Sequence, residues 1–170
     1  MNKALFLDRD GTINKYGEYI YKIEDFIFID GAIDFIKFYN DRGYYVFVVS
    51  NQAGIARGYY NESDVSKLHK WVDIELKKYG AHIDEWVYCP HHPTAGIGNR
   101  RIDCNCRKPK TGMVDYLCNK YNIDKAQSLL VGDKIWDIQC GERAGIKSFM
   151  LRNEDYNELK KQISEYYNII

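Results

Sequence analysis

Apolar and polar positions along the chain form blocks that predict strands and helices in alternation. Unbroken apolar runs such as "KALFLD" are typical of strands that are covered on both faces. Apolar residues at helical spacing, as in "GAIDFIKFYNDRG", predict amphipathic helices that end at a glycine. These criteria predict strands over 3–8, 44–50, 83–90, 128–133 and 146–151, and helices over 31–43, 61–80, 111–122, 135–145 and from about Asn153.

The alternation of strands and helices predicts an α/β fold, a Rossmann-like three-layer sandwich with a mainly parallel sheet. We expect one domain over residues 1–170, because no internal repeat or linker divides the chain. In such sheets, ligands bind outside the carboxyl ends of the strands. Asp8, Ser50 and Asp133 each stand at the end of a predicted strand, so we expect them to meet at one edge.

Four aspartates occupy this edge in the predicted fold: Asp8, Asp10, Asp133 and Asp137. Converging carboxylates repel one another, and each is driven towards protonation unless a cation lies among them. Oxygen ligands beside a phosphate suit Mg²⁺. Any one of these aspartates alone is more readily explained as a helix cap or turn residue, but the set favours a magnesium site.

A second group of metal-binding residues lies in the turn-rich segment 89–106. "YCPHH" and "DCNC" supply a Cys-x-His pair, twelve further residues and a Cys-x-Cys pair, a pattern that predicts a closed, structural Zn²⁺ site. The intervening segment has few apolar residues with which to fold without a metal. The alternative is two buried cysteine pairs and a surface histidine.

Four motifs, "DRDGT", "VVSNQ", "RKP" and "GDKxxD", follow one another in the order found in the haloacid dehalogenase-like (HAD-like) phosphohydrolases. The chain resembles this family from residue 4 to about residue 150. The resemblance implies that Asp8 is the nucleophile, that Asp10 is the general acid and base, and that Mg²⁺ is held by Asp8, the carbonyl of Asp10 and Asp133. It also implies that Ser50 and Lys108 hold the phosphoryl oxygens.

Three further side chains near these motifs have expected positions. Asp137 is expected to orient its neighbours, or simply to lie in the first turn of a helix. Lys110 is expected in solvent at the start of the next helix. In the loop, the Cys-x-His pattern favours a zinc set of Cys89, His91, Cys104 and Cys106, and leaves His92 facing solvent or substrate.

"YCPHHP" and "CNCRKP" resemble the zinc loop of the group within this family that acts on heptose 1,7-bisphosphates. Histidinol-phosphate phosphatases share that loop and are the nearest alternative. The first group removes the C7 phosphate during the synthesis of ADP- or GDP-heptose, for lipopolysaccharide or capsule sugars. The resemblance implies substrate contacts from Tyr16, Gly17, Glu18, Tyr19, Asn51, Gln52, Ala53, Arg107 and Lys134. The chain departs from the group at Tyr16-Gly17 and at Ala53, which leaves the preferred anomer open.

A neighbouring cation favours a substrate with two phosphates. Arg107 adjoins Lys108, and its planar guanidinium suits a second, distal phosphate. Arg57 is another candidate cation, or else a solvated loop residue. Only forty residues separate Asp10 from Ser50, so we expect no cap domain.

Composition narrows the classes of partner. The chain has 24 basic and 24 acidic side chains, which disfavours nucleic acid. It has no apolar run long enough for a membrane span, so we expect a cytoplasmic protein whose five cysteines stay reduced. We also expect a monomer, because an active site without a cap domain needs no partner to complete it. Cys118 and Cys140 are expected in the core. A nucleic-acid 3′-end phosphatase and a non-catalytic zinc-binding module are the alternatives from other classes.

Overall fold

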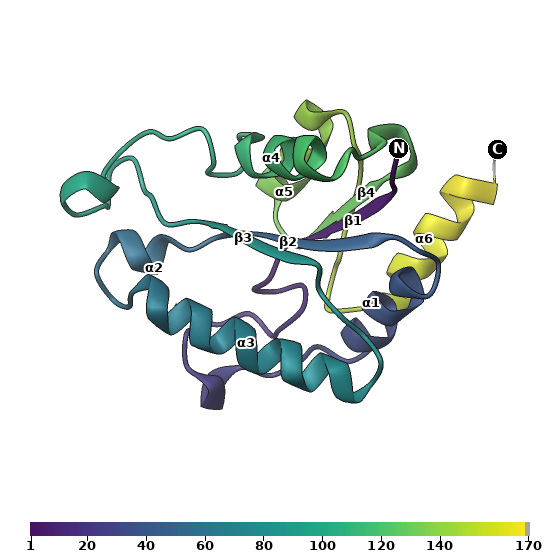
Figure 1. Cartoon of the computed structure of the whole chain (residues 1–170), viewed down its shortest axis with the longest axis horizontal. Helices are drawn as coiled ribbons and strands as arrows, with labels where there is room; N and C mark the ends of the chain where they lie inside the picture. Colours follow the sequence, from purple (N-terminus) through teal and green to yellow (C-terminus); the bar gives the residue numbers. More distant parts are fainter. Residues whose placement is uncertain (169–170) are drawn as a thin grey trace.

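The computed structural model describes residues 1–168, and its centre is a sheet of five parallel strands in the order β3-β2-β1-β4-β5 (Figure 1). The predicted α/β fold with a parallel sheet is therefore confirmed. The strands are β1 (Ala4–Leu7), β2 (Tyr45–Asn51), β3 (Glu85–Cys89), β4 (Leu129–Gly132) and β5 (Lys147–Met150).

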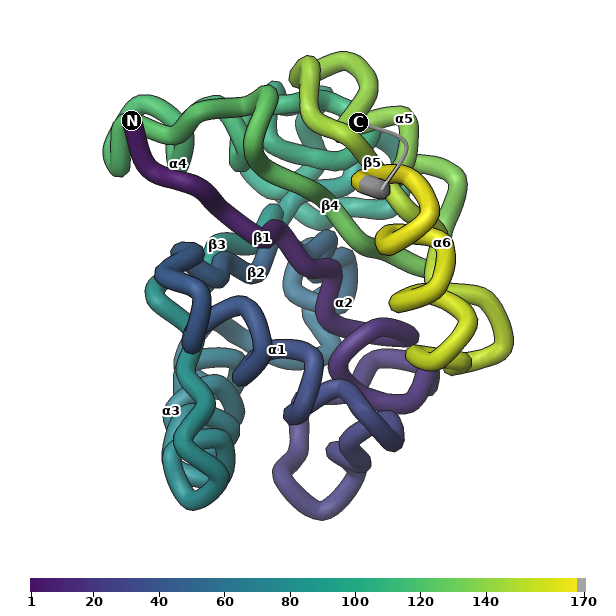
Figure 2. Tube along the Cα trace, turned by 90° about the vertical axis from the view of Figure 1, so that its right-hand side faces the viewer, coloured from purple at the N-terminus to yellow at the C-terminus, as the bar shows by residue number. Residues whose placement is uncertain are grey.

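Helices cover both faces of this sheet, which is why the strands are apolar without alternation. Leu5 and Leu7 of β1 belong to the core on one face, whereas Ala4 and Phe6 belong to the core on the other. The first face is covered by α1 (Ala32–Asn40), α3 (Glu62–Lys78) and α6 (Tyr156–Asn168), and the second by α4 (Gly112–Tyr121) and α5 (Ile135–Ala144) (Figure 2). The short elements are α2 (Ala53–Ala56) and the 3-10 turns η1 (Ile23–Asp25), η2 (Gly98–Arg100) and η3 (Lys125–Gln127).

Most element boundaries lie within three residues of the predictions, and two features differ more clearly. The terminal helix begins at Tyr156 rather than near Asn153, because Asn153 and Glu154 adopt the left-handed conformation, which cannot continue into a helix. The short helix α2 was not predicted, since four residues carry no helical period. By contrast, the predicted start of α3 is confirmed by a reciprocal capping box between Asn61 and Asp64.

Strand order decides where the site forms. β1 lies between β2 and β4. The connection from β1 to β2 passes through α1 on one face of the sheet, and that from β3 to β4 passes through α4 on the other, so a crevice opens at the carboxyl ends of the strands. Within residues 1–168, the segment between β1 and α1 contains η1 alone and that between β3 and α4 contains η2 alone. In the described chain, these two segments are therefore loops and do not form a separate cap domain. No helix in it is both long and apolar enough to cross a bilayer.

Candidate active site

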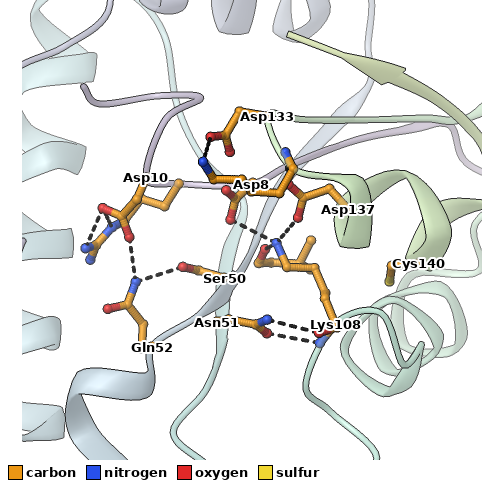
Figure 3. A network of polar contacts seen from close by, with 12 residues as sticks. Asp8, Asp10, Ser50, Asn51, Gln52, Lys108, Asp133, Asp137 and Cys140 are labelled. Carbon is orange, nitrogen blue, oxygen red and sulfur yellow. Dashed lines mark hydrogen bonds and ion pairs between the residues drawn. The ribbon is translucent and has the colours of Figure 1, made fainter. Parts of the chain in front are cut away.

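A buried lysine links three strand ends beneath the crevice. Lys108 Nζ lies 2.8 Å from Asp8 Oδ1 and 2.7 Å from Asp137 Oδ1, and it donates to the carbonyl of Val49 at 2.6 Å (Figure 3). Asp8 is fixed in turn by its backbone N–H, which donates to the carbonyl of Val131 in β4. Lys108 is 3% exposed, so its charge is neutralised by protein carboxylates rather than by water.

Burial and charge together set the protonation of this group. Burial raises the pKa of Asp8 well above its ordinary value; the charge of Lys108 opposes this and that of Asp137 adds to it. Burial works against the Lys108 ammonium, but Asp8 and Asp137 outweigh it and raise the pKa of Lys108. Burial also raises the pKa of Asp133, against the charge of Lys134. One lysine thus does not neutralise all three carboxylates.

The residues at this edge fit a hard divalent cation. Carboxylate oxygens of Asp8, Asp133 and Asp137 lie within 4.8 Å of one another. Asp137 is already committed, because one oxygen pairs with Lys108 and the other accepts from the backbone N–H of Lys134. Asp133 Oδ1 is buried and lacks a hydrogen-bond partner within residues 1–168. Asp8 and Asp133 are therefore the oxygen donors that remain for Mg²⁺.

A glycine allows this close approach. Gly11 has φ +82°, and a Cβ there would lie 2.3 Å from Asp133 Oδ2. A side chain at residue 11 would push Asp133 away from the turn that carries Asp8 and Asp10.

Asp10 lies beside Asp8 with its carboxylate held on both oxygens. Oδ1 accepts from Arg9 and from Asn14 Nδ2, and Oδ2 accepts from Gln52 Nε2. Gln52 Nε2 also donates to Ser50 Oγ at 2.8 Å, so the end of β2 is joined to the turn after β1 (Figure 3).

A cavity of about 160 Å³ opens above Asp8 and Asp10. Eight of the nine predicted substrate-binding residues line it: Tyr16, Gly17, Tyr19, Asn51, Gln52, Ala53, Arg107 and Lys134. Glu18 does not line the cavity and is exposed. Ser50, Lys108 and Asp133 are not among the lining residues either.

Two aromatic residues in the cavity wall were missed in the sequence. Tyr60 and Trp136 line it together with Tyr16, whose ring lies 4.4 Å from Lys134 Nζ. Trp136 is 41% exposed although it is large and apolar. Its position within the motif "GDKIWD" could have indicated that it lies near the active site. Tyr60 follows α2, and no local pattern pointed to it.

The second metal-binding group is compact. Cys89 Sγ lies 3.4 Å from Cys104 Sγ and 3.1 Å from Cys106 Sγ, and His91 Nδ1 lies 3.4 Å from Cys106 Sγ. All four predicted ligand atoms lie within 4.8 Å of one another, and the cysteines are free rather than joined in disulfides. Four soft or borderline donors around one point fit a tetrahedral metal with Zn–S distances of about 2.3 Å. The alternative of separate cysteine pairs does not describe this arrangement.

Two neighbouring side chains have local partners. His92 is partly exposed, and its Nδ1 accepts from the backbone N–H groups of Thr94 and Ala95. The Lys110 side chain is 40% exposed, and its Nζ lies 2.6 Å from Asp103 Oδ1 and donates to the carbonyl of Cys104. Cys118 and Cys140 are buried, as predicted.

The cysteine loop is tied directly to the cavity. The backbone N–H of Arg107 donates to Cys104 Sγ, and the backbone N–H of Lys108 donates to Asn51 Oδ1. Burial opposes ionisation of Cys104, but hydrogen bonds from Cys106 and Arg107 lower its pKa to about 6. Arg57 is partly buried, and its Nε has no hydrogen-bond partner in the part of the chain that the structure describes.

Comparison with known proteins agrees with this geometry. The HAD-hydrolase-like family model matches residues 105–166. A D-glycero-beta-D-manno-heptose-1,7-bisphosphate 7-phosphatase from Haemophilus influenzae is 44% identical over 151 residues, which cover 89% of this chain and 82% of the relative. A D-glycero-alpha-D-manno-heptose-1,7-bisphosphate 7-phosphatase from Photorhabdus laumondii is 47% identical over 144 residues, covering 85% and 79%. The chain belongs to this family of HAD-like heptose-bisphosphate phosphatases.

Membership of the heptose-bisphosphate phosphatase family makes the protein a phosphoric monoester hydrolase. A D,D-heptose 1,7-bisphosphate phosphatase from B. bronchiseptica, solved with magnesium and phosphate, has the same fold, with a TM-score of 0.80 and 26% identity over 94% of this chain and 86% of that one. Neither a binding module nor a nucleic-acid phosphatase is favoured by these relatives.

Proposed function

We propose that the protein removes the C7 phosphate of D-glycero-D-manno-heptose 1,7-bisphosphate with Mg²⁺, through an aspartyl-phosphate on Asp8. The observation that carries this proposal is the cavity whose floor holds Asp8 and Asp10 and whose rim holds Arg107. The names of the family members supply the substrate class.

Each carboxylate has its own part in the proposed reaction. Asp8 attacks phosphorus, and Asp10 gives a proton to the leaving C7 oxygen. Asp10 then takes a proton from the water that attacks the aspartyl-phosphate. Lys108 and Ser50 hold the phosphoryl oxygens as charge shifts in the transition state. Asp137 keeps Lys108 in place through their 2.7 Å contact.

Two metals complete the proposal. Asp8, Asp133 and the carbonyl of Asp10 are the residues that would hold Mg²⁺, which neutralises charge on the phosphoryl group when bound. Cys89, His91, Cys104 and Cys106 would hold Zn²⁺ as a structural ion. Support comes from the chemistry of each donor set, two carboxylates with a carbonyl in one case and three thiols with an imidazole in the other.

The phosphate at C1 is assigned to Arg107, with Tyr16, Gly17, Tyr19, Asn51, Gln52, Ala53 and Lys134 around the sugar. Glu18 does not line the cavity, and its side chain is exposed. In this proposal it contacts the substrate only after its side chain moves towards the cavity. We further propose a single domain over 1–170, of which residues 169 and 170 lie outside the described range, acting as a cytoplasmic monomer. Free cysteines are typical of a reducing compartment.

The decisive measurement is a comparison of kcat/KM with Mg²⁺ for both anomers of the heptose bisphosphate, histidinol phosphate and a nucleotide. We expect the bisphosphate to be preferred and phosphate to leave from C7. If histidinol phosphate were the preferred substrate, the heptose bisphosphate assignment would be wrong, but the protein would still be a phosphatase.

Arg107→Ala tests the second phosphate. It should raise KM for the bisphosphate about 10-fold or more, and KM for a heptose 7-monophosphate far less, because a guanidinium–phosphate contact contributes only where that phosphate exists. Arg101→Ala, an exposed arginine of the same loop, is the matched control. Equal effects of Arg107→Ala on both substrates would contradict the assignment.

A further inference from the structure

An arginine in the middle of the "DRDGT" motif is completely buried. Arg9 is 0% exposed, and its Nε and Nη2 lie 3.1 and 2.9 Å from Asp10 Oδ1. Nη2 also donates to the carbonyl of Ile20, and Nη1 lies 3.3 Å from His69 Nε2. Arg9 does not line the cavity, so it stands behind Asp10 as seen from the substrate.

His69, the partner of Arg9, also has a fixed environment. A guanidinium has only donors, so His69 Nε2 accepts and the ring proton is on Nδ1. The His69 ring stacks on Trp86 with centroids 4.1 Å apart, and Trp86 Nε1 donates to Asp73 Oδ1 at 2.8 Å. Burial and the charge of Arg9 lower the pKa of His69 to about 3, so the ring is neutral near pH 7. A continuous series of contacts therefore joins α3 to Asp10.

The partners that satisfy the buried Arg9 belong to the turn after β1, to the chain beside the cavity-lining segment and to α3. Burying an arginine is costly unless its charge is paired and its donors are satisfied. Asp10 is the one carboxylate with which Arg9 forms a salt bridge in the described chain. The carbonyl of Ile20 adjoins the segment whose Tyr16, Gly17 and Tyr19 line the cavity. One guanidinium thus connects the substrate-facing segment, the acid–base carboxylate and α3.

We propose that Arg9, held by His69, is a positioning residue that sets the direction of the Asp10 carboxyl for proton transfer to the leaving oxygen. The inference rests on the proposed function, in which Asp10 is the general acid. The P–O bond breaks with its electron pair going to the leaving oxygen, and that oxygen takes the proton of Asp10. A sugar alkoxide needs this proton, whereas a p-nitrophenolate leaves without one.

The test compares two leaving groups in one variant. Arg9→Lys keeps the charge but loses the fork that reaches Asp10, Ile20 and His69 together. We expect kcat/KM to fall about 100-fold for the sugar phosphate, the size of a general-acid contribution, and less than about 3-fold for p-nitrophenyl phosphate. Arg42→Lys, at an exposed arginine beside Phe38, should change neither value. Equal losses on both substrates would overturn the proposal.

A second pair of variants keeps the test valid if Arg9→Lys does not fold. His69→Phe retains a ring against Trp86 but removes the acceptor for Arg9, whereas His69→Gln retains an acceptor. We expect a selective loss of about 10-fold on the sugar phosphate for His69→Phe and a smaller one for His69→Gln. A non-selective loss in His69→Phe would overturn the positioning role and leave the phosphatase intact. A wild-type protein without activity on either substrate would instead refute the proposed function, and the inference with it.

Discussion

The two groups of residues proposed to bind metal are assembled in opposite ways. The carboxylate site takes Asp8, Asp133 and Lys108 from segments far apart in sequence, which the sheet brings to one edge. The cysteine site takes all four ligands from residues 89–106, which start at the last residue of β3 and then contain η2. The first is positioned by a buried core, whereas in the second the cysteines reach the core but the segment between the ligands exposes Ile97 and Ile102.

This difference predicts different responses to loss of metal. The sheet keeps the carboxylates together without an ion, because Lys108 already offsets part of their charge. The loop holds its thiols and imidazole at contact distance from one another. The carboxylate site should therefore survive metal removal with its fold intact, and the cysteine loop should lose its structure.

The largest expected effect is on chemistry without a change in fold. Asp8→Asn should lower kcat by at least about 10⁴-fold, because the amide cannot form the aspartyl-phosphate. The variant should still unfold in one cooperative transition, at a midpoint lowered by the loss of the buried ion pair with Lys108. Trapping of labelled phosphate on the wild type but not on the variant checks the covalent step, and full turnover by Asp8→Asn would refute it.

Next in size is the loss of the loop metal. Cys104→Ser should reduce zinc from about one ion per chain to nearly none and lower kcat/KM about 100-fold, because Lys108 follows the loop and small displacements of such groups are costly. Elemental analysis and limited proteolysis within 89–106 measure the two effects. Cys118→Ser, in the core of α4, is the control, and a wild-type protein without zinc would contradict the assignment.

A smaller effect tests how the carboxylate site is held. Asp137→Asn breaks a buried ion pair with Lys108 and should lower the free energy of unfolding by about 3 kcal/mol. Denaturant unfolding measures the change. Asp41→Asn, which breaks the exposed pair with Lys37, should leave stability nearly unchanged. If the denaturation midpoint of Asp137→Asn equals that of the wild type, the ion pair with Asp137 is not needed to hold Lys108.

The smallest effect, taken over one pH unit, appears in acid. The pKa of His69 is lowered from 6.5 to about 3 in the folded protein, so above pH 6.5 it contributes no pH dependence. Below pH 6.5 the unfolded chain binds a proton that the folded chain does not, and stability should fall by up to about 1.4 kcal/mol per pH unit. His69→Gln should flatten this slope, and the exposed His82→Gln should not. If the slope of stability against pH is unchanged in His69→Gln, the loss of stability in acid comes from other groups, such as the loop thiols.

The sequence alone was sufficient for features that depend on local pattern. The apolar runs identified all five strands, and the position of Asp8, Ser50 and Asp133 at strand ends identified the edge where they meet. The cysteine and histidine ligands were recognisable because their spacing lies within one loop. The short helix α2 and the first turn of α6 were misjudged, because they depend on single backbone conformations rather than on a repeating period.

Only the tertiary structure decided the contacts that join distant segments. The burial of Lys108 between Asp8 and Asp137, the approach of Tyr60 and Trp136 to the cavity, and the contact of Arg9 with His69 each join side chains from separate elements. The physical reason is that residue spacing determines which face of one element is apolar, whereas the partner of a buried charge is determined by how the elements pack. The motif "DRDGT" therefore predicted phosphate-ester hydrolysis. The contact between His69 of α3 and Arg9 is what led to the proposed positioning role of Arg9.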